Sequence, residues 1–122
     1  MLINVVVQES ERKTIKPIQT FVSQQSAISL GTPINFTHGL ANFNSLTQTC
    51  LLTGFLVCTT AQYGYVPGDI VTPERGISYQ LTTTQIICRP ASNGVYIVRA
   101  NNGRWAKINP NRWNIMIKAL VL

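Results

Sequence analysis

Short strand-forming segments that recur about every ten residues constrain the fold of this chain more than any other feature. Gly, Pro, Asn and Thr interrupt the sequence every few residues, and apolar residues do not recur at helical spacing over any long window. The intervals are rich in apolar, β-branched and aromatic residues. They cover residues 54–60, 77–81, 85–89, 95–100, 105–108 and 113–121. This spacing predicts an all-β protein, a single antiparallel β-sandwich or a small barrel.

The last expected strand is apolar on both faces. Because side chains alternate along a strand, Met116, Lys118 and Leu120 form one row while the neighbouring positions form a second apolar row. A terminal strand of this kind belongs in the middle of a sheet or in a subunit interface. We therefore expect Met116 and Leu120, together with His38 and Leu40, to lie at a trimer interface.

The chain has few charged residues for its size. Asp, Glu, Lys and Arg make up 11% of its 122 residues, whereas a free monomer usually carries about a quarter. Residues 27–56 contain none of the four types. No stretch approaches the roughly 18–20 consecutive apolar residues that span a bilayer, so we expect no membrane partner. A surface this neutral indicates a protein that is covered by copies of itself or by a larger assembly.

The sequence predicts two regions, an extended N-terminal arm over residues 1–25 and a β-sandwich domain over residues 26–122. Residues 1–25 hold half of the acidic residues, and a polar segment at residues 23–26 follows them. The apolar start is short and lacks a basic leader, so a secretory signal is not expected. An arm of this kind adds a strand to another protein's sheet edge, and the alternative is a first strand of the same domain. The expected contact residues are Val5, Val6, Val7, Arg12, Lys13 and Lys16.

Few residues in this chain suit catalysis or metal binding. It has four acids, one histidine and three cysteines, and no phosphate loop, nucleophile elbow or metal-ligand spacing. Cys50, Cys58 and Cys88 are expected to be reduced core residues, with a Cys50–Cys58 pair left open. His38 precedes a glycine, which is typical of a strand end or an interface. We therefore expect no enzymatic activity, no cofactor and no bound metal.

The net charge of +6 comes mostly from the scarcity of acids. Nucleic-acid-binding proteins place Lys and Arg on one stripe with aromatic residues among them. This chain does so only weakly, around Arg99, Arg104, Trp105, Lys107 and Arg112. Nucleic acid is therefore an unlikely partner, and the positive balance fits an acidic protein surface at least as well.

Residues 63–69 have the composition of an aromatic-tipped loop. Tyrosine offers contact area with little conformational entropy to lose, so Tyr63 and Tyr65 suit recognition of a ligand. The alternative is a wide hairpin whose tyrosines pack on the sheet. With Arg104 and Trp105, they form the candidate receptor-binding loop.

Several short motifs stand out between residues 27 and 122. In chain order, they are Thr37-His38-Gly39-Leu40, Gly54-Phe55-Leu56-Val57-Cys58, Gly64-Tyr65-Val66-Pro67-Gly68-Asp69-Ile70-Val71, Tyr96-Ile97-Val98, Gly103 and Trp113-Asn114-Ile115. Together they resemble the small β-sandwich head domains of tailed-bacteriophage decoration (cement) and tail-fibre proteins. The resemblance covers roughly residues 27–122, and a polar insert over residues 41–53 departs from it.

The resemblance implies a homotrimer whose work is binding without catalysis. Because no shaft repeats precede the domain, it favours a decoration protein that binds the major capsid protein through the arm. Such a protein assembles in the host cytoplasm, lies on the outer capsid surface of the virion and stabilises the head. The alternative is a tail-fibre head domain that binds a host surface glycan or receptor.

Overall fold

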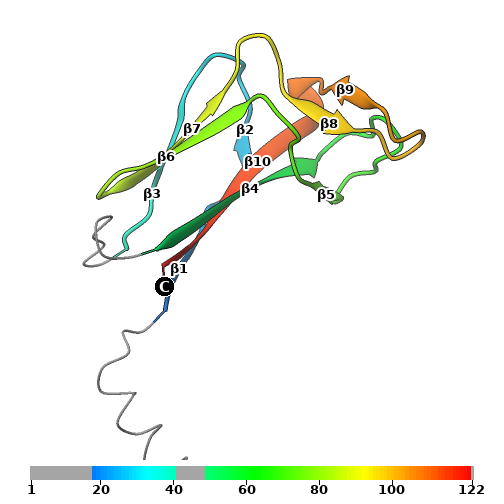
Figure 1. The fold of residues 1–122 in the computed structure, drawn as a ribbon. Coiled ribbons are helices and arrows are strands. Elements are labelled where there is room, and N and C mark those ends of the chain that lie inside the picture. The colour runs from blue at the N-terminus through cyan, green and yellow to red at the C-terminus, as the bar shows by residue number, and fades with distance from the viewer. Residues whose placement is uncertain (1–17, 41–48, 122) are drawn as a thin grey trace, which may run out of the picture.

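The chain folds into antiparallel β-structure, seen in a computed structural model that describes residues 18–40 and 49–121 (Figure 1). In this part of the chain the only helix is η1, a 3₁₀ turn at Pro110–Arg112, and no helix is long and apolar enough to cross a membrane. The prediction of an all-β protein is therefore confirmed. The strands are β1 Gln19–Val22, β2 Ser26–Ala27, β3 Ile34–Thr37, β4 Cys50–Cys58, β5 Ile70–Val71, β6 Ile77–Leu81, β7 Gln85–Pro90, β8 Tyr96–Val98, β9 Trp105–Lys107 and β10 Trp113–Val121.

The strands form two sheets that face each other and a separate hairpin (Figure 1). The larger sheet has the order β1-β10-β4-β5, with β2 also paired to β10, and the smaller sheet has the order β3-β7-β6. Strands β8 and β9 form the hairpin. Two packed antiparallel sheets are consistent with a β-sandwich. The expected place of the last strand, in the middle of a sheet, is confirmed by β10.

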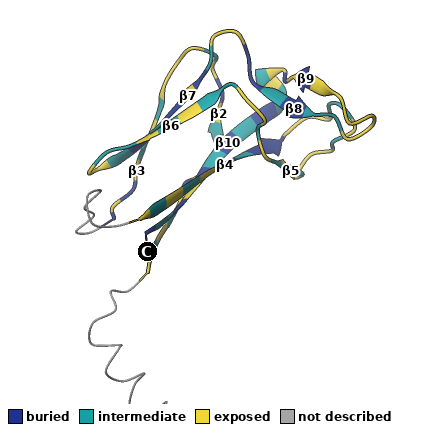
Figure 2. Cartoon of the chain, viewed as in Figure 1, coloured by how far each residue is buried: buried dark blue, intermediate teal, exposed yellow. Residues whose placement is uncertain are grey.

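The core lies between the two sheets and follows from the period of two along each strand. Ile115 and Ile117 of β10 are fully buried, and Ile86 and Cys88 of β7 are fully buried in the same cluster. Exposed and buried positions alternate along the strands (Figure 2). Trp113 closes one end of this core, where its indole N–H donates to the Gln62 side chain at 2.9 Å.

The larger sheet begins earlier than the sequence indicated. All four residues of β1 pair with β10, so Gln19–Val22 belongs to the sheet and the arm boundary expected at residue 25 does not hold. Residues 23–25 of the polar segment are an interruption between β1 and β2, which both pair with β10. The arm residues Val5, Val6, Val7, Arg12, Lys13 and Lys16 lie outside the described residues.

Strand β4 also begins earlier than expected. It starts at Cys50, so residues 50–53 are strand rather than part of a polar insert, and residues 41–48 lie outside the described part.

The open Cys50–Cys58 pairing is excluded because these residues occupy opposite ends of β4, about 27 Å apart at the usual rise per residue. All three cysteines are free thiols. Burial raises the pKa of each thiol, that of Cys88 to about 12.

Candidate functional site

His38 is a structural residue within one copy of the chain. The Leu40 backbone N–H donates to Nδ1 of His38 at 2.9 Å, which leaves Nε2 to donate to the Thr82 carbonyl oxygen at 2.8 Å. Both His38 and Leu40 are buried in the single chain. Their expected place at a trimer interface is therefore corrected: they belong to the interior of one subunit, because backbone groups of the same chain satisfy both ring nitrogens.

The outer face of the larger sheet, the side turned away from the smaller sheet, is mainly apolar. Gly54 of β4 lies against Tyr79 of the smaller sheet, and it pairs with Ile117 of β10, so both positions face the core. Because side chains alternate along a strand, the residues next to Gly54 and Ile117, and every second residue from there, point outward. The outward positions include Met116 and Leu120, each partly buried, and Lys118 between them. This face thus contains both remaining residues of the expected trimer interface.

Exposed apolar side chains extend across this outer face. Leu51 of β4 pairs with Leu120, and Val22 of β1 pairs with Lys118. Leu51 is 51% exposed, Val22 is 54% exposed, and Ile70 of β5 is 61% exposed. Among the described strand residues on this face, Lys118 is the only charged one.

The outer face of the smaller sheet has the opposite character. Ile86 and Cys88 of β7 are buried in the core, so the residues that alternate with them point outward. The register of β3 and β6 with β7 then gives the outward positions of those two strands. Apart from Ile87, they are polar or charged: Asn35, Thr37, Ser78, Gln80, Gln85 and Arg89. Both sheets therefore cover one core, but only the smaller sheet presents the polar outer face expected towards water.

The four residues of the expected receptor-binding loop divide into two pairs. The Tyr63 hydroxyl donates to the Lys107 carbonyl oxygen and the Tyr65 hydroxyl donates to the Val98 carbonyl oxygen, both at 2.6 Å. These tyrosines therefore pack on the body of the protein, as the alternative interpretation held. Arg104 is exposed, and Trp105 is 57% exposed.

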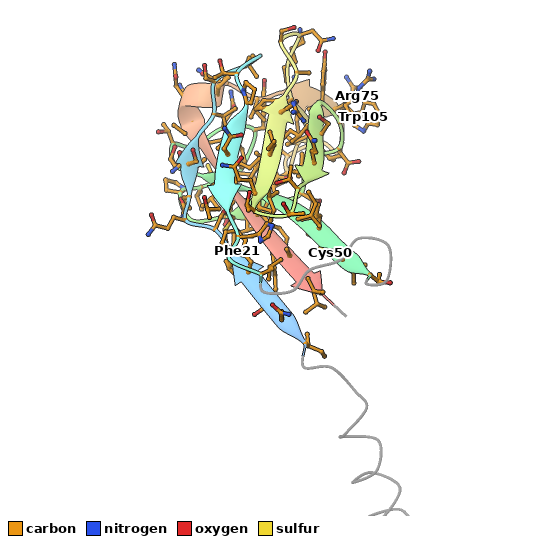
Figure 3. All side chains as sticks on the ribbon, turned by 90° about the vertical axis from the view of Figure 1, so that its left-hand side faces the viewer. Phe21, Cys50, Arg75 and Trp105 are labelled. Carbon is orange, nitrogen blue, oxygen red and sulfur yellow. The ribbon has the colours of Figure 1, made fainter. Side chains whose placement is uncertain are left out.

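Trp105 belongs to a cluster of cationic and aromatic side chains on the β8–β9 hairpin. The Arg75 guanidinium carbon lies 5.9 Å from the centre of the Trp105 ring and 5.4 Å from that of Tyr96. The Lys107 ammonium lies 5.8 Å from the Tyr96 ring centre. We call Arg75, Tyr96, Trp105 and Lys107 the hairpin surface. Figure 3 shows Arg75 and Trp105 together at one end of the molecule, with Phe21 and Cys50 towards the other end.

Sequence reasoning missed two members of the hairpin surface, Arg75 and Tyr96. They meet through an isolated antiparallel bridge between residues that are far apart in the chain. No local pattern signals such a contact. The basic stripe considered for nucleic acid is also divided, because Arg99 lies over the Tyr63 ring at 4.8 Å and Arg112 donates to the Ala61 carbonyl oxygen at 2.7 Å.

The residues described here contain no cluster of three or more His, Cys, Asp or Glu side chains that could hold a metal ion. No protein-family model, curated protein or solved structure matches this chain.

Proposed function

We propose that this protein is a structural virion component that works by binding and associates with copies of itself through the outer face of its larger sheet. The observation that carries the proposal is the contrast between the two outer faces. A sheet face that meets water is normally polar, and a contiguous apolar face on a soluble domain marks an interaction site. The low charge of the whole chain supports the same interpretation.

The energetics favour covering this face. Val22, Leu51 and Ile70 are each about half exposed in the single chain. Burying the exposed part of such a side chain contributes about 1 kcal/mol. Lys118 places a cation within the apolar row, and its long aliphatic stem allows the ammonium group to reach the rim of an interface. A second copy supplies an equally apolar counterpart, with Lys118 as its only charged strand residue among those described.

Within this proposal, the role is that of a decoration protein on the outer surface of a phage head. Trimers bind the major capsid protein through the N-terminal arm, and multivalent attachment gives tight binding from weak individual contacts. This part of the proposal depends on residues 1–17 and on the resemblance to phage head domains.

The test compares outward-facing substitutions on the two sheets in the full chain. We expect wild-type protein to sediment as a trimer and the Leu51→Glu and Leu120→Glu variants to sediment as monomers, because each places a carboxylate in the apolar face. Ile87→Glu, on the outer face of the smaller sheet, is the matched control and should remain trimeric. Far-UV circular dichroism checks that all variants are folded. A monomeric wild type, or unchanged assembly of Leu120→Glu, would contradict the proposal.

A second candidate function is recognition of a host surface, and the exposure of Arg104 and Trp105 favours it. In this case the larger sheet holds the assembly together and the hairpin surface contacts the ligand. The two functions use different parts of the molecule, since the hairpin lies at the opposite end from β1 (Figure 1).

A further inference from the structure

The hairpin surface places two cations on either side of one aromatic ring. Arg75 forms a bridge with Tyr96, and Tyr96 pairs with Lys107. Neighbouring strands lie about 4.8 Å apart, so Arg75 and Lys107 are separated by roughly 10 Å across Tyr96. Trp105 is two residues from Lys107 on the same strand and therefore points to the same side. The result is a flat aromatic area with a positive charge at each side.

Among the described residues, no ion pair engages the cations of this surface. Asp69 and Glu74 are the only acids in the described part of the chain. The Asp69 carboxylate accepts a hydrogen bond from the Val66 N–H at 2.9 Å, and the exposed Glu74 precedes Arg75 in the chain. The charged groups of Arg75 and Lys107 lie over aromatic faces and form no ion pair, so their charges are available to an anion.

The backbone holds these side chains in place. The Tyr63 hydroxyl donates a hydrogen bond to the Lys107 carbonyl oxygen, which fixes the end of β9 against the loop that contains Tyr63. At the tip of the hairpin, the Asn102 side chain accepts the Arg104 N–H at 2.9 Å. Gly103 adopts a φ of 70°, which a side chain rarely tolerates. A surface organised in this way loses little entropy when a ligand binds.

We propose that the hairpin surface binds an anionic sugar, with the sugar ring on Trp105 and its acidic group between Arg75 and Lys107. The exposed face of one indole suits one pyranose ring, because the apolar C–H side of a sugar packs on an aromatic face. A single-stranded nucleic acid instead requires a groove that follows the backbone and several aromatic residues for successive bases. In the described residues the other tryptophan, Trp113, is buried in the core. The observations therefore favour the sugar.

The inference rests on the second candidate function and not on self-association. Purified full-length protein is titrated with trigalacturonic acid, sialyllactose and a heparin hexasaccharide, with maltotriose as the neutral control and an oligothymidylate as the nucleic-acid control. Because Trp105 is exposed and Trp113 is buried, tryptophan fluorescence reports binding at the hairpin. Isothermal titration calorimetry then gives the affinity.

We expect at least one anionic sugar to bind and maltotriose to bind far more weakly. Arg75→Gln should reduce the affinity about tenfold or more, because a charge-assisted contact is lost. Arg89→Gln, an exposed arginine on the smaller sheet, is the matched control and should bind like wild type. Trp105→Ala should abolish the fluorescence change and most of the binding.

Three outcomes would overturn the inference: no anionic sugar binds, Arg75→Gln and Arg89→Gln bind equally well, or only the oligothymidylate binds. The Leu120→Glu variant separates this result from the proposed assembly. If it is monomeric and still binds the sugar in calorimetry, both proposals hold. If wild type is trimeric and no anionic sugar binds, self-association stands and the inference fails.

Discussion

Ser23 fills a gap in the hydrogen-bond ladder of β10, and removing its hydroxyl group should destabilise the fold. Strand β1 pairs with residues 118–121 and β2 pairs with residues 114 and 115, so Ile117 has no strand partner on this side. The Ser23 backbone N–H donates to the Ile117 carbonyl oxygen, and the Ser23 hydroxyl accepts the Ile117 N–H, both at 2.8 Å. A single residue therefore satisfies both backbone groups of a buried position.

The magnitude for Ser23→Ala follows from the burial of this contact. Ser23 is 7% exposed and Ile117 is fully buried, so alanine leaves the Ile117 N–H without a partner and out of reach of bulk water. An unsatisfied buried donor costs about 1–3 kcal/mol. We therefore expect a loss of about 2 kcal/mol in the free energy of unfolding. For a chain of this length that corresponds to a fall in Tm of about 8 °C.

Urea unfolding, followed by circular dichroism and by the fluorescence of buried Trp113, measures this loss. Ser26→Ala is the matched control, because the Ser26 hydroxyl donates to the Ala27 carbonyl oxygen at an exposed site. That variant should lie within about 0.5 kcal/mol of wild type. Ser23→Thr keeps the hydroxyl and should recover part of the loss. The reasoning is refuted if Ser23→Ala and Ser26→Ala have the same stability.

Two further predictions concern the contact between the sheets. A methyl group at Gly54 would overlap the Tyr79 hydroxyl. Gly54→Ala should therefore lower the free energy of unfolding, measured in urea, by about 1–3 kcal/mol. If the loss is the same in the wild-type and Tyr79→Leu backgrounds, the steric cause is wrong. Burial raises the pKa of Cys88 from 9.0 and that of Tyr79 from 10.0, each to about 12. The folded chain thus keeps protons that the unfolded chain releases, so stability is fully present below pH 9.0 and is lost as pH rises towards about 12. Urea midpoints across this range should fall less steeply for Cys88→Ala than for wild type, and parallel curves would count against the prediction.

The elements that could be predicted from the sequence are those whose pattern and turns are local. The β8–β9 hairpin surrounds an Asn-Asn-Gly turn, and β10 follows a proline break. Strand β3 was missed because it has four residues and its partner, β7, lies about fifty residues further along the chain. The sequence places β1 in the expected arm, with a first strand of the domain as the alternative, and does not decide between them because β1 pairs with the last strand of the chain. Neither segment carries enough apolar periodicity to be recognised without that partner.

The candidate site shows the same limit. Met116 and Leu120 could be assigned to one apolar row because the alternation of β10 is visible in the sequence, but that this row faces outward follows only from the contact of Gly54 with Tyr79. The interior position of His38 could not be predicted, since its partner Thr82 comes from a distant loop. Likewise, the hairpin surface depends on Arg75, whose contact with Trp105 arises from the fold alone.

The low charge of the chain is unevenly distributed, and this bears on how the protein works. Of the ten basic residues, three lie outside the described part. In the described part, Arg75 and Lys107 lie together on the hairpin surface, whereas Lys118 is the only charge on the outer face of the larger sheet. A protein that was merely poor in charge would show no such division. A mainly apolar face suited to burial, with cations on the hairpin, instead fits the proposed self-association, because it leaves the charged groups of the hairpin accessible after the apolar face is covered.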